Sequence, residues 1–330
     1  MRKLGLMSAQ FADMPLESLC QKMNEMGYTA IELACLGDHF NVGEAAVNQS
    51  YCNEKLALLK KYGLECKVIS GHLIGQCVGD FYDSRLDNFA PVEFAGSKEG
   101  IRTWAIEEMK RLAKAAANMG VPVVSFFTGS SIWRYIYSFP QAAQEQIEQG
   151  YEEVYQLWTP IMDVYDKYGV KLALEVHPTE IAFDYYTTQR LLEKFKHRPT
   201  LGLTFDPSHL LWQHVNPTVF LRDFMPYVYN VHMKDVKLNL DGKAGVLGSH
   251  IEFGDTRRGW NFVSLGHGDI DFGAIVRELN QAKYIGNITI EWEDSGMDRM
   301  HGAKDALQNL QKFNFPSSEL AFDKALSSTV

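Results

Sequence analysis

Four side chains able to bind a metal ion stand near the C-terminal ends of four predicted strands. They are Glu175, Asp206, His232 and Glu291, in strands predicted at 171–177, 201–206, 228–235 and 287–293. In each strand, large apolar residues alternate with small or polar ones, which is the period of a strand with two different faces. All four metal-capable residues share the small and polar face. Since the carboxyl ends of parallel strands meet where such proteins bind ligands, we expect the four side chains to converge.

Three carboxylates and one imidazole would form an oxygen-rich site for one divalent cation. Three negative charges and a charge of +2 leave about −1, so that the cation relieves the repulsion among the acids. The donor set favours Mn²⁺, with Mg²⁺, Co²⁺, Fe²⁺ or Zn²⁺ as alternatives. A single Glu or Asp at a strand end is often only a helix cap or an ion-pair partner. The shared phase on four consecutive strands is what favours ligation.

The strands that must position these residues belong to a strand–helix pattern repeated about eight times, without an antiparallel hairpin signal. Further strands are predicted at 4–8, 29–35, 65–70 and 121–127, and amphipathic helices follow them. This alternation predicts an α/β fold, a single (β/α)₈ TIM barrel with extended βα loops. We expect one domain over 1–330, with the barrel at about 4–313 and a C-terminal tail at 314–330. A doubly wound open sheet is less favoured, because no G-x-G-x-x-G motif opens the first helix.

The composition excludes several classes of protein. The 330 residues carry a formal net charge of −9 with scattered Lys and Arg, which disfavours binding to nucleic acid or to an anionic membrane. The five cysteines include no C-x-x-C pair, which argues against a disulfide framework or a thiolate zinc site. No signal peptide and no apolar run of about 18 residues is recognisable, so a cytoplasmic location is expected.

Five short motifs between residues 174 and 294 carry a resemblance to a known family. They read L-E-V-H-P, T-F-D-P-S-H, V-H-M-K-D, G-x-G-D-I-D-F and I-E-W-E-D. They resemble the sugar phosphate isomerase/epimerase superfamily of xylose isomerase-like TIM barrels, over roughly residues 4 to 313. The resemblance implies that the four residues named above hold one divalent metal ion. It also implies that Glu175 and Glu291 are the catalytic acid/base pair and that His209 contacts a substrate oxygen. The endonuclease branch, which carries three metals and further His and Asp ligands, is less similar.

The chemistry expected of such a site is proton transfer next to a carbonyl group. A carboxylate that ligates through one oxygen keeps the other free to take a proton, so Glu175 and Glu291 could flank one sugar carbon. The leading hypothesis is a divalent-metal-dependent sugar isomerase or epimerase acting through an enediolate. The alternative is a lyase or dehydratase acting on a keto-inositol or a 3-keto-glycoside, and a third is a barrel that only binds sugar. A homodimer or homotetramer is suggested by the resemblance alone.

Further residues are weaker candidates for contact with the substrate. His72, His177 and Lys234 follow or end predicted strands and could face the barrel mouth. The alternatives are a structural hydrogen bond for His72, support of a neighbouring ligand for His177 and a solvated strand end for Lys234. Trp133 and Trp260 lie in long loops and could stack on a sugar ring.

The Gly-rich insertion at 236–268 suggests a lid over the barrel mouth. Arg257, beside Arg258 in this insertion, could meet an anion or form a loop salt bridge. No phosphate-binding glycine loop is evident, which favours a free sugar, keto-sugar or glycoside as the small-molecule substrate.

Overall fold

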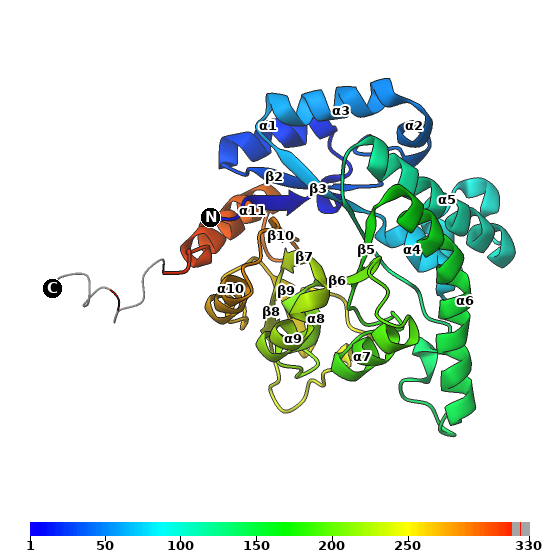
Figure 1. The fold of residues 1–330 in the computed structure, drawn as a ribbon. Helices are drawn as coiled ribbons and strands as arrows, with labels where there is room; N and C mark the ends of the chain where they lie inside the picture. The colour runs from blue at the N-terminus through cyan, green and yellow to red at the C-terminus, as the bar shows by residue number, and fades with distance from the viewer. Residues whose placement is uncertain (319–323, 325–330) are drawn as a thin grey trace.

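The computed structural model describes residues 1–318 and Lys324, and within this part eight parallel strands close into a barrel. Around the barrel the strands follow the order β1-β10-β7-β6-β5-β4-β3-β2 (Figure 1). Their bounds are β1 Leu4–Met7, β2 Ala30–Ala34, β3 Glu65–Ser70, β4 Val123–Phe126, β5 Lys171–Glu175, β6 Leu201–Phe205, β7 Val228–Met233 and β10 Ile288–Ile290. The predicted (β/α)₈ barrel is confirmed, while most of the predicted tail at 314–330 lies outside the described residues.

Helices surround the strands on the outside of the barrel (Figure 1). The principal ones are α1 Leu16–Met26, α3 Gln49–Lys61, α5 Lys98–Asn118, α6 Gln144–Tyr168, α7 Tyr185–Lys194, α9 Pro217–Phe224, α10 Phe272–Gln281 and α11 Arg299–Phe313. Three further helices lie in the loops after β2, β3 and β6, namely α2 Val42–Val47, α4 His72–Gly79 and α8 Pro207–Leu211. Local chemistry sets the ends of the longer helices: the Asn216 side chain caps α9, and Gly169 ends α6 at a φ of 67°.

The alternating residues of the strands separate the outer core from the barrel interior. Leu172 and Leu174 of β5 are fully buried and belong to the main apolar core, which the helices share. Their neighbour Ala173 joins a small interior cluster with Val68 and Val123. This cluster partly fills the barrel, so the polar residues beyond it stand over a packed interior rather than an open channel.

The insertion after β7 contains a second, two-stranded sheet, which corrects the expectation of a chain without hairpins. β8 (Asp235–Leu238) and β9 (Trp260–Val263) pair in antiparallel register. The strand predicted at 228–235 therefore ends at Met233, and Asp235 begins the new sheet. The many glycines and polar residues of the insertion hide this pairing, because they interrupt the alternation that indicates strands.

A single carboxylate ties the two ends of this insertion together. The Asp235 carboxylate accepts backbone N–H groups from Val236, Gly266 and Gly268 at 2.9 Å each, and from Ile270 at 3.3 Å. A Cβ atom on Gly268 would lie 2.1 Å from Asp235 Oδ1, so only glycine lets the chain approach this closely. The insertion thus leaves and rejoins the barrel at one fixed point.

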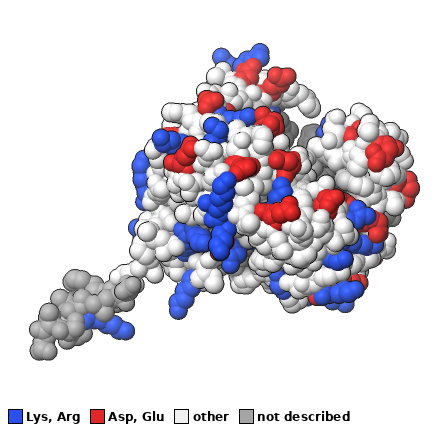
Figure 2. Space-filling view, turned by 90° about the horizontal axis from the view of Figure 1, so that it is seen from above, with Lys and Arg blue, Asp and Glu red and all other residues white. Residues whose placement is uncertain are grey.

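Charged side chains of both signs lie on the surface of the protein (Figure 2). Acidic and basic side chains intermingle on the face seen from above in Figure 2. No helix within the described residues is long and apolar enough to cross a bilayer. All five cysteines are free thiols, as their spacing predicts.

Candidate functional site

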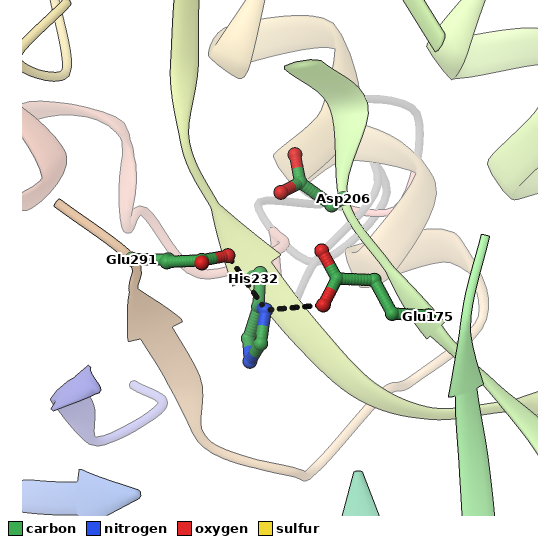
Figure 3. Close-up of side chains that lie close together, drawn as sticks. All are labelled: Glu175, Asp206, His232 and Glu291. Atoms are coloured by element: carbon green, nitrogen blue, oxygen red, sulfur yellow. Dashed lines mark ion pairs between the residues drawn. The ribbon is translucent and has the colours of Figure 1, made fainter. Parts of the chain in front are cut away.

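The four metal-capable residues meet at the C-terminal mouth of the barrel (Figure 3). Glu175 ends β5 and His232 lies in β7, whereas Asp206 and Glu291 directly follow β6 and β10. One possible ligand atom from each residue lies within 4.8 Å of the others. All four side chains are buried, the most exposed being Glu291 at 8 %. The convergence expected from their shared strand face is present in the structure.

Each of the four residues directs one atom without a hydrogen-bond partner into this cluster. These atoms are Glu175 Oε1, Asp206 Oδ2, His232 Nδ1 and Glu291 Oε2. For Asp206 the division is clear: Oδ1 caps α8 by accepting the Ser208 N–H at 2.8 Å, while Oδ2 has no hydrogen bond and lies 3.3 Å from the Lys234 ammonium and 3.4 Å from His209 Nε2. Buried polar atoms are rarely left unpaired, since their desolvation then goes uncompensated. Three carboxylate oxygens and one imidazole nitrogen fit a divalent cation, and we call this cluster the cage.

Neighbouring charged groups keep Glu175 and His232 charged, although burial disfavours the charged form of each. Burial alone would raise the pKa of Glu175, but the nearby imidazoles of His209 and His72 outweigh it and keep that pKa well below its usual range. Burial would also lower the pKa of His232, yet the surrounding carboxylates, first among them Glu32, raise it well above the ordinary value. A cation bound by the His232 imidazole would therefore displace a proton from that imidazole.

Three of the predicted substrate-contacting residues touch the cage. His72, the first residue of α4, places Nε2 at 2.9 Å from Glu175 Oε2. His209 Nε2 lies 3.4 Å from both Glu175 Oε1 and Asp206 Oδ2. The buried Lys234 ammonium lies 3.0 Å from Glu291 Oε2 and 4.7 Å from the centroid of the Phe262 ring. These groups surround the carboxylates with donors.

His177 lies one step away from the cage. Its ring packs at 4.1 Å from the His209 ring and at 4.8 Å from the Phe127 ring, centroid to centroid. Burial lowers the pKa of His177 well below its usual value, so this imidazole is neutral. It therefore supports His209 rather than meeting a carboxylate directly.

The structure does not bring Trp133, Trp260 or Arg257 to the cage. Trp133 packs edge-on against Phe183, beside a second cavity bordered by α6 and α7. Trp260 stacks almost parallel on Trp212 at 4.6 Å, and its indole N–H donates to the Val246 carbonyl. Arg257 forms an exposed ion pair with Asp255, two residues before it. The insertion nevertheless reaches the mouth, because Phe262 of β9 packs against His209 and Lys234.

A cavity of about 270 Å³ opens beside the cage. Its polar lining comes from Glu175, Glu291, His72, Ser70 and Gln10, and its apolar lining from Met7, Ala9, Ala34, Cys35, Leu36, Gly71, Leu73, Ile74 and Phe127. No Lys or Arg is among these lining residues. The cavity is large enough for a small molecule and offers few polar groups beyond the cage.

Two residues that the sequence reasoning missed contact the cage. Glu32 of β2 is 1 % exposed, and its Oε2 lies 2.9 Å from His232 Nε2. Gln10 Nε2 donates to Glu291 Oε1 at 3.2 Å. Glu32 was visible as the one acidic residue in the strand A-I-E-L-A, in the phase of the small residues. Gln10 follows β1 in a short turn and carries no such signal.

The comparisons with known proteins agree with this fold. The chain matches the family described as xylose isomerase-like TIM barrel over residues 20–313. It is 24 % identical to the uncharacterized protein YfiH of Bacillus subtilis (strain 168) over 326 residues, covering 94 % of this chain and 98 % of that protein.

Two solved structures show the same fold at low sequence identity. The 3-keto-D-glucoside 4-epimerase YcjR from E. coli superposes with a TM-score of 0.67 at 16 % identity, covering 94 % of this chain and all of YcjR. The probable 3-DHS dehydratase AsbF from Bacillus anthracis gives a TM-score of 0.66 at 20 % identity, covering 94 % and 98 % of the two chains. The family match extends over most of the barrel and includes all four residues of the cage. The resemblance carried by the five motifs is thereby confirmed, and the chain belongs to the xylose isomerase-like TIM-barrel family.

Proposed function

We propose that this protein is a divalent-metal-dependent sugar isomerase or epimerase, with Mn²⁺ as the first candidate for the cation. The observation that carries the proposal is the convergence of four buried donor atoms that have no hydrogen bond, one from each of Glu175, Asp206, His232 and Glu291. Two of these residues are glutamates, one at the end of β5 and one after β10, and these strands are separated by β6 and β7 in the barrel. A substrate bound at the mouth would therefore meet one glutamate from each side.

The protein's own residues supply the proton transfers. When bound, the cation supplies Lewis acidity toward adjacent carbonyl and hydroxyl oxygens. Glu175 takes the proton next to the carbonyl, and the imidazole of His72, 2.9 Å from Oε2, holds this carboxylate in place. Glu291, held by Gln10 and Lys234, returns a proton that it has drawn from solvent, and Glu175 releases the proton it took to solvent before the next turnover. Return to the opposite face of the same carbon gives an epimer, and return to the neighbouring carbon gives an isomer.

The lining of the cavity favours an uncharged substrate. Recognition of a phosphate requires a cation or a nest of N–H groups, and no Lys or Arg lines the cavity beside the cage. The nearest ammonium, that of Lys234, lies among three carboxylates and is already neutralised. We therefore propose a free sugar, keto-sugar or glycoside over a sugar phosphate. His209 and Lys234 are proposed to bind sugar oxygens, and His177 to support them. For Trp133, Trp260 and Arg257 the proposed contact would require a substrate that extends beyond this cavity.

A lyase acting by β-elimination is the second candidate. The same first step, removal of a proton next to a carbonyl, leads to elimination when a leaving group departs from the neighbouring carbon. An epimerase and a probable dehydratase resemble this fold to nearly the same extent, which keeps both outcomes open. The lyase substrate would be a keto-inositol or a 3-keto-glycoside.

Proton exchange with solvent tests the proposal. The Mn²⁺-loaded protein is incubated in D₂O with ketoses, inososes and 3-keto-glucosides, and the products are followed by NMR. Deuterium incorporation with an unchanged formula supports an isomerase or epimerase, whereas loss of water or of the aglycone supports the lyase. The variant Glu175→Gln should slow exchange by about 100-fold or more. The matched control is Glu180→Gln, which alters a buried carboxylate that does not touch the cage. Full exchange in Glu175→Gln would refute the assigned role.

A further inference from the structure

We infer that Glu32 is a positioning residue that holds the imidazole of His232 so that Nδ1 faces the cage. The inference rests on the proposed function, because it treats His232 as a ligand of the cation. Glu32 itself lends no atom to the cage: its hydrogen-bond partners among the described residues are His232 and Asn230. Its effect on the cation would pass through the ring of His232.

The geometry joins two strands that are not neighbours in the barrel. Glu32 comes from β2 and His232 from β7, with β1 and β10 between them in the strand order. Glu32 reaches inward because Ile31 and Leu33, on either side of it, pack outward into the main core. Its Oε2 lies 2.9 Å from His232 Nε2, and the Asn230 side-chain amide donates to the same oxygen at 3.0 Å. The three side chains are 0–1 % exposed, so water does not compete for these contacts.

The chemistry of the imidazole gives this contact its consequence. A carboxylate oxygen only accepts hydrogen bonds, so the ring nitrogen that faces Glu32, Nε2, carries the proton. The other nitrogen, Nδ1, lies 3.2 Å from Glu291 Oε2 and 3.8 Å from Glu175 Oε2, inside the cage. A carboxylate that accepts from the far side of a ligating histidine fixes the tautomer and the ring orientation and raises the basicity of the ligating nitrogen. Glu32 therefore stands where it would strengthen His232 as a ligand.

A purely structural role for Glu32 makes a different prediction. A buried carboxylate that only fills space would affect stability when replaced, but it would leave the affinity for a cation and the state of the ring unchanged. Glu32 Oε1 has no hydrogen-bond partner, whereas Oε2 contacts both His232 and Asn230. A carboxylate that only filled space would not concentrate its hydrogen bonds on one oxygen in this way.

Two variants separate these roles, and neither measurement uses substrate. Glu32→Gln keeps an acceptor of the same size but removes the charge, whereas Glu32→Leu removes the acceptor and fills the space. Glu180→Gln is the matched control, since it makes the same substitution at another buried glutamate, away from His232. Thermal unfolding verifies that each variant is folded. Titration with Mn²⁺, followed by calorimetry or by the electron paramagnetic resonance signal of the free ion, gives the dissociation constant.

We expect affinity losses of about 10-fold for Glu32→Gln and about 100-fold for Glu32→Leu, with the control unchanged. A ¹H–¹⁵N spectrum should show a solvent-protected Nε2–H signal of His232 that shifts in Glu32→Gln and disappears in Glu32→Leu. Wild-type affinity together with an unchanged signal in both Glu32 variants would overturn the inference. If the wild-type protein binds no divalent cation, the proposed function fails, and the Nε2–H signal alone still decides whether Glu32 holds the ring.

Discussion

Replacing Glu180 by Gln should change how the stability of the protein depends on pH. Glu180 lies in the loop between β5 and α7 and is fully buried. Its Oε2 accepts the Gly129 N–H at 2.6 Å and the Thr128 hydroxyl at 3.1 Å, which ties this loop to the chain after β4. Burial raises the pKa of Glu180 from 4.5 to about 8, so the carboxyl group is protonated in the folded protein at neutral pH.

The sign and size of the effect follow from this pKa. Between pH 4.5 and 8 the folded protein keeps a proton on Glu180 that the unfolded chain releases. Stability from this group is therefore complete below pH 4.5 and is lost as the pH rises through 8. The slope is about 1.4 kcal/mol per pH unit, so the loss between pH 5 and pH 7.5 is about 3 kcal/mol. Glutamine has the shape of the protonated acid and does not titrate, so Glu180→Gln should escape this loss.

Urea unfolding of both proteins from pH 5 to pH 8 measures the difference directly. Other titrating groups are common to the two proteins and cancel when their free energies of unfolding are subtracted. We expect nearly equal stabilities at pH 5 and a variant that is more stable by about 3 kcal/mol at pH 7.5. Parallel curves across this range would mean that Glu180 is ionised in the folded protein, and the reasoning from burial would then be wrong.

Three further changes test the cage, the insertion and the barrel interior. Mn²⁺ at 100 times its dissociation constant should stabilise the protein by about 2.7 kcal/mol, seen as a rise in Tm that EDTA reverses; an unchanged Tm would argue against a cation in the cage. Asp235→Ala leaves four backbone N–H groups without their acceptor, so limited proteolysis within 239–259 should become faster. The circular dichroism of the barrel should stay the same, and an unchanged rate of cleavage would contradict the anchoring role. Gly202→Ala would put a Cβ at 2.2 Å from the Tyr229 ring and should lower the free energy of unfolding, measured in urea, by about 1–3 kcal/mol. Gly245→Ala, with open space around the new Cβ, should lower it little, and equal losses would refute the packing argument.

The parts of the molecule that were predictable are those set by strand period and strand direction. Alternation fixes which residues face the barrel interior, and parallel strands bring their C-terminal ends to one place. Glu175, Asp206 and Glu291 could therefore be grouped without any knowledge of distances. Glu32 obeys the same alternation, but it lies in the middle of its strand rather than near its end, so its position along the strand does not indicate a place at the barrel mouth.

The contacts of loop residues depend on the path of the chain, which no period encodes. Trp260 stacks on Trp212, a residue 48 positions earlier that follows α8. Arg257 instead finds its partner locally, in Asp255. Trp133 meets Phe183 across two separate βα loops. In each case the residue type indicates that the side chain packs on a ring or pairs with a charge. Only the path of the folded loop determines which partner it contacts.

The anchoring of the insertion at Asp235 has a consequence for how this family can diversify. Because both ends of the insertion are fixed to one carboxylate, the spacing between β7 and α10 is independent of what lies between them. Segments of different length or sequence could be exchanged between residues 239 and 259 while the eight-stranded frame keeps its register. Such a grafted segment would alter the wall that Phe262 and its neighbours present to the barrel mouth. The insertion is therefore a segment whose exchange would reshape the barrel mouth while the four residues of the cage stay in place.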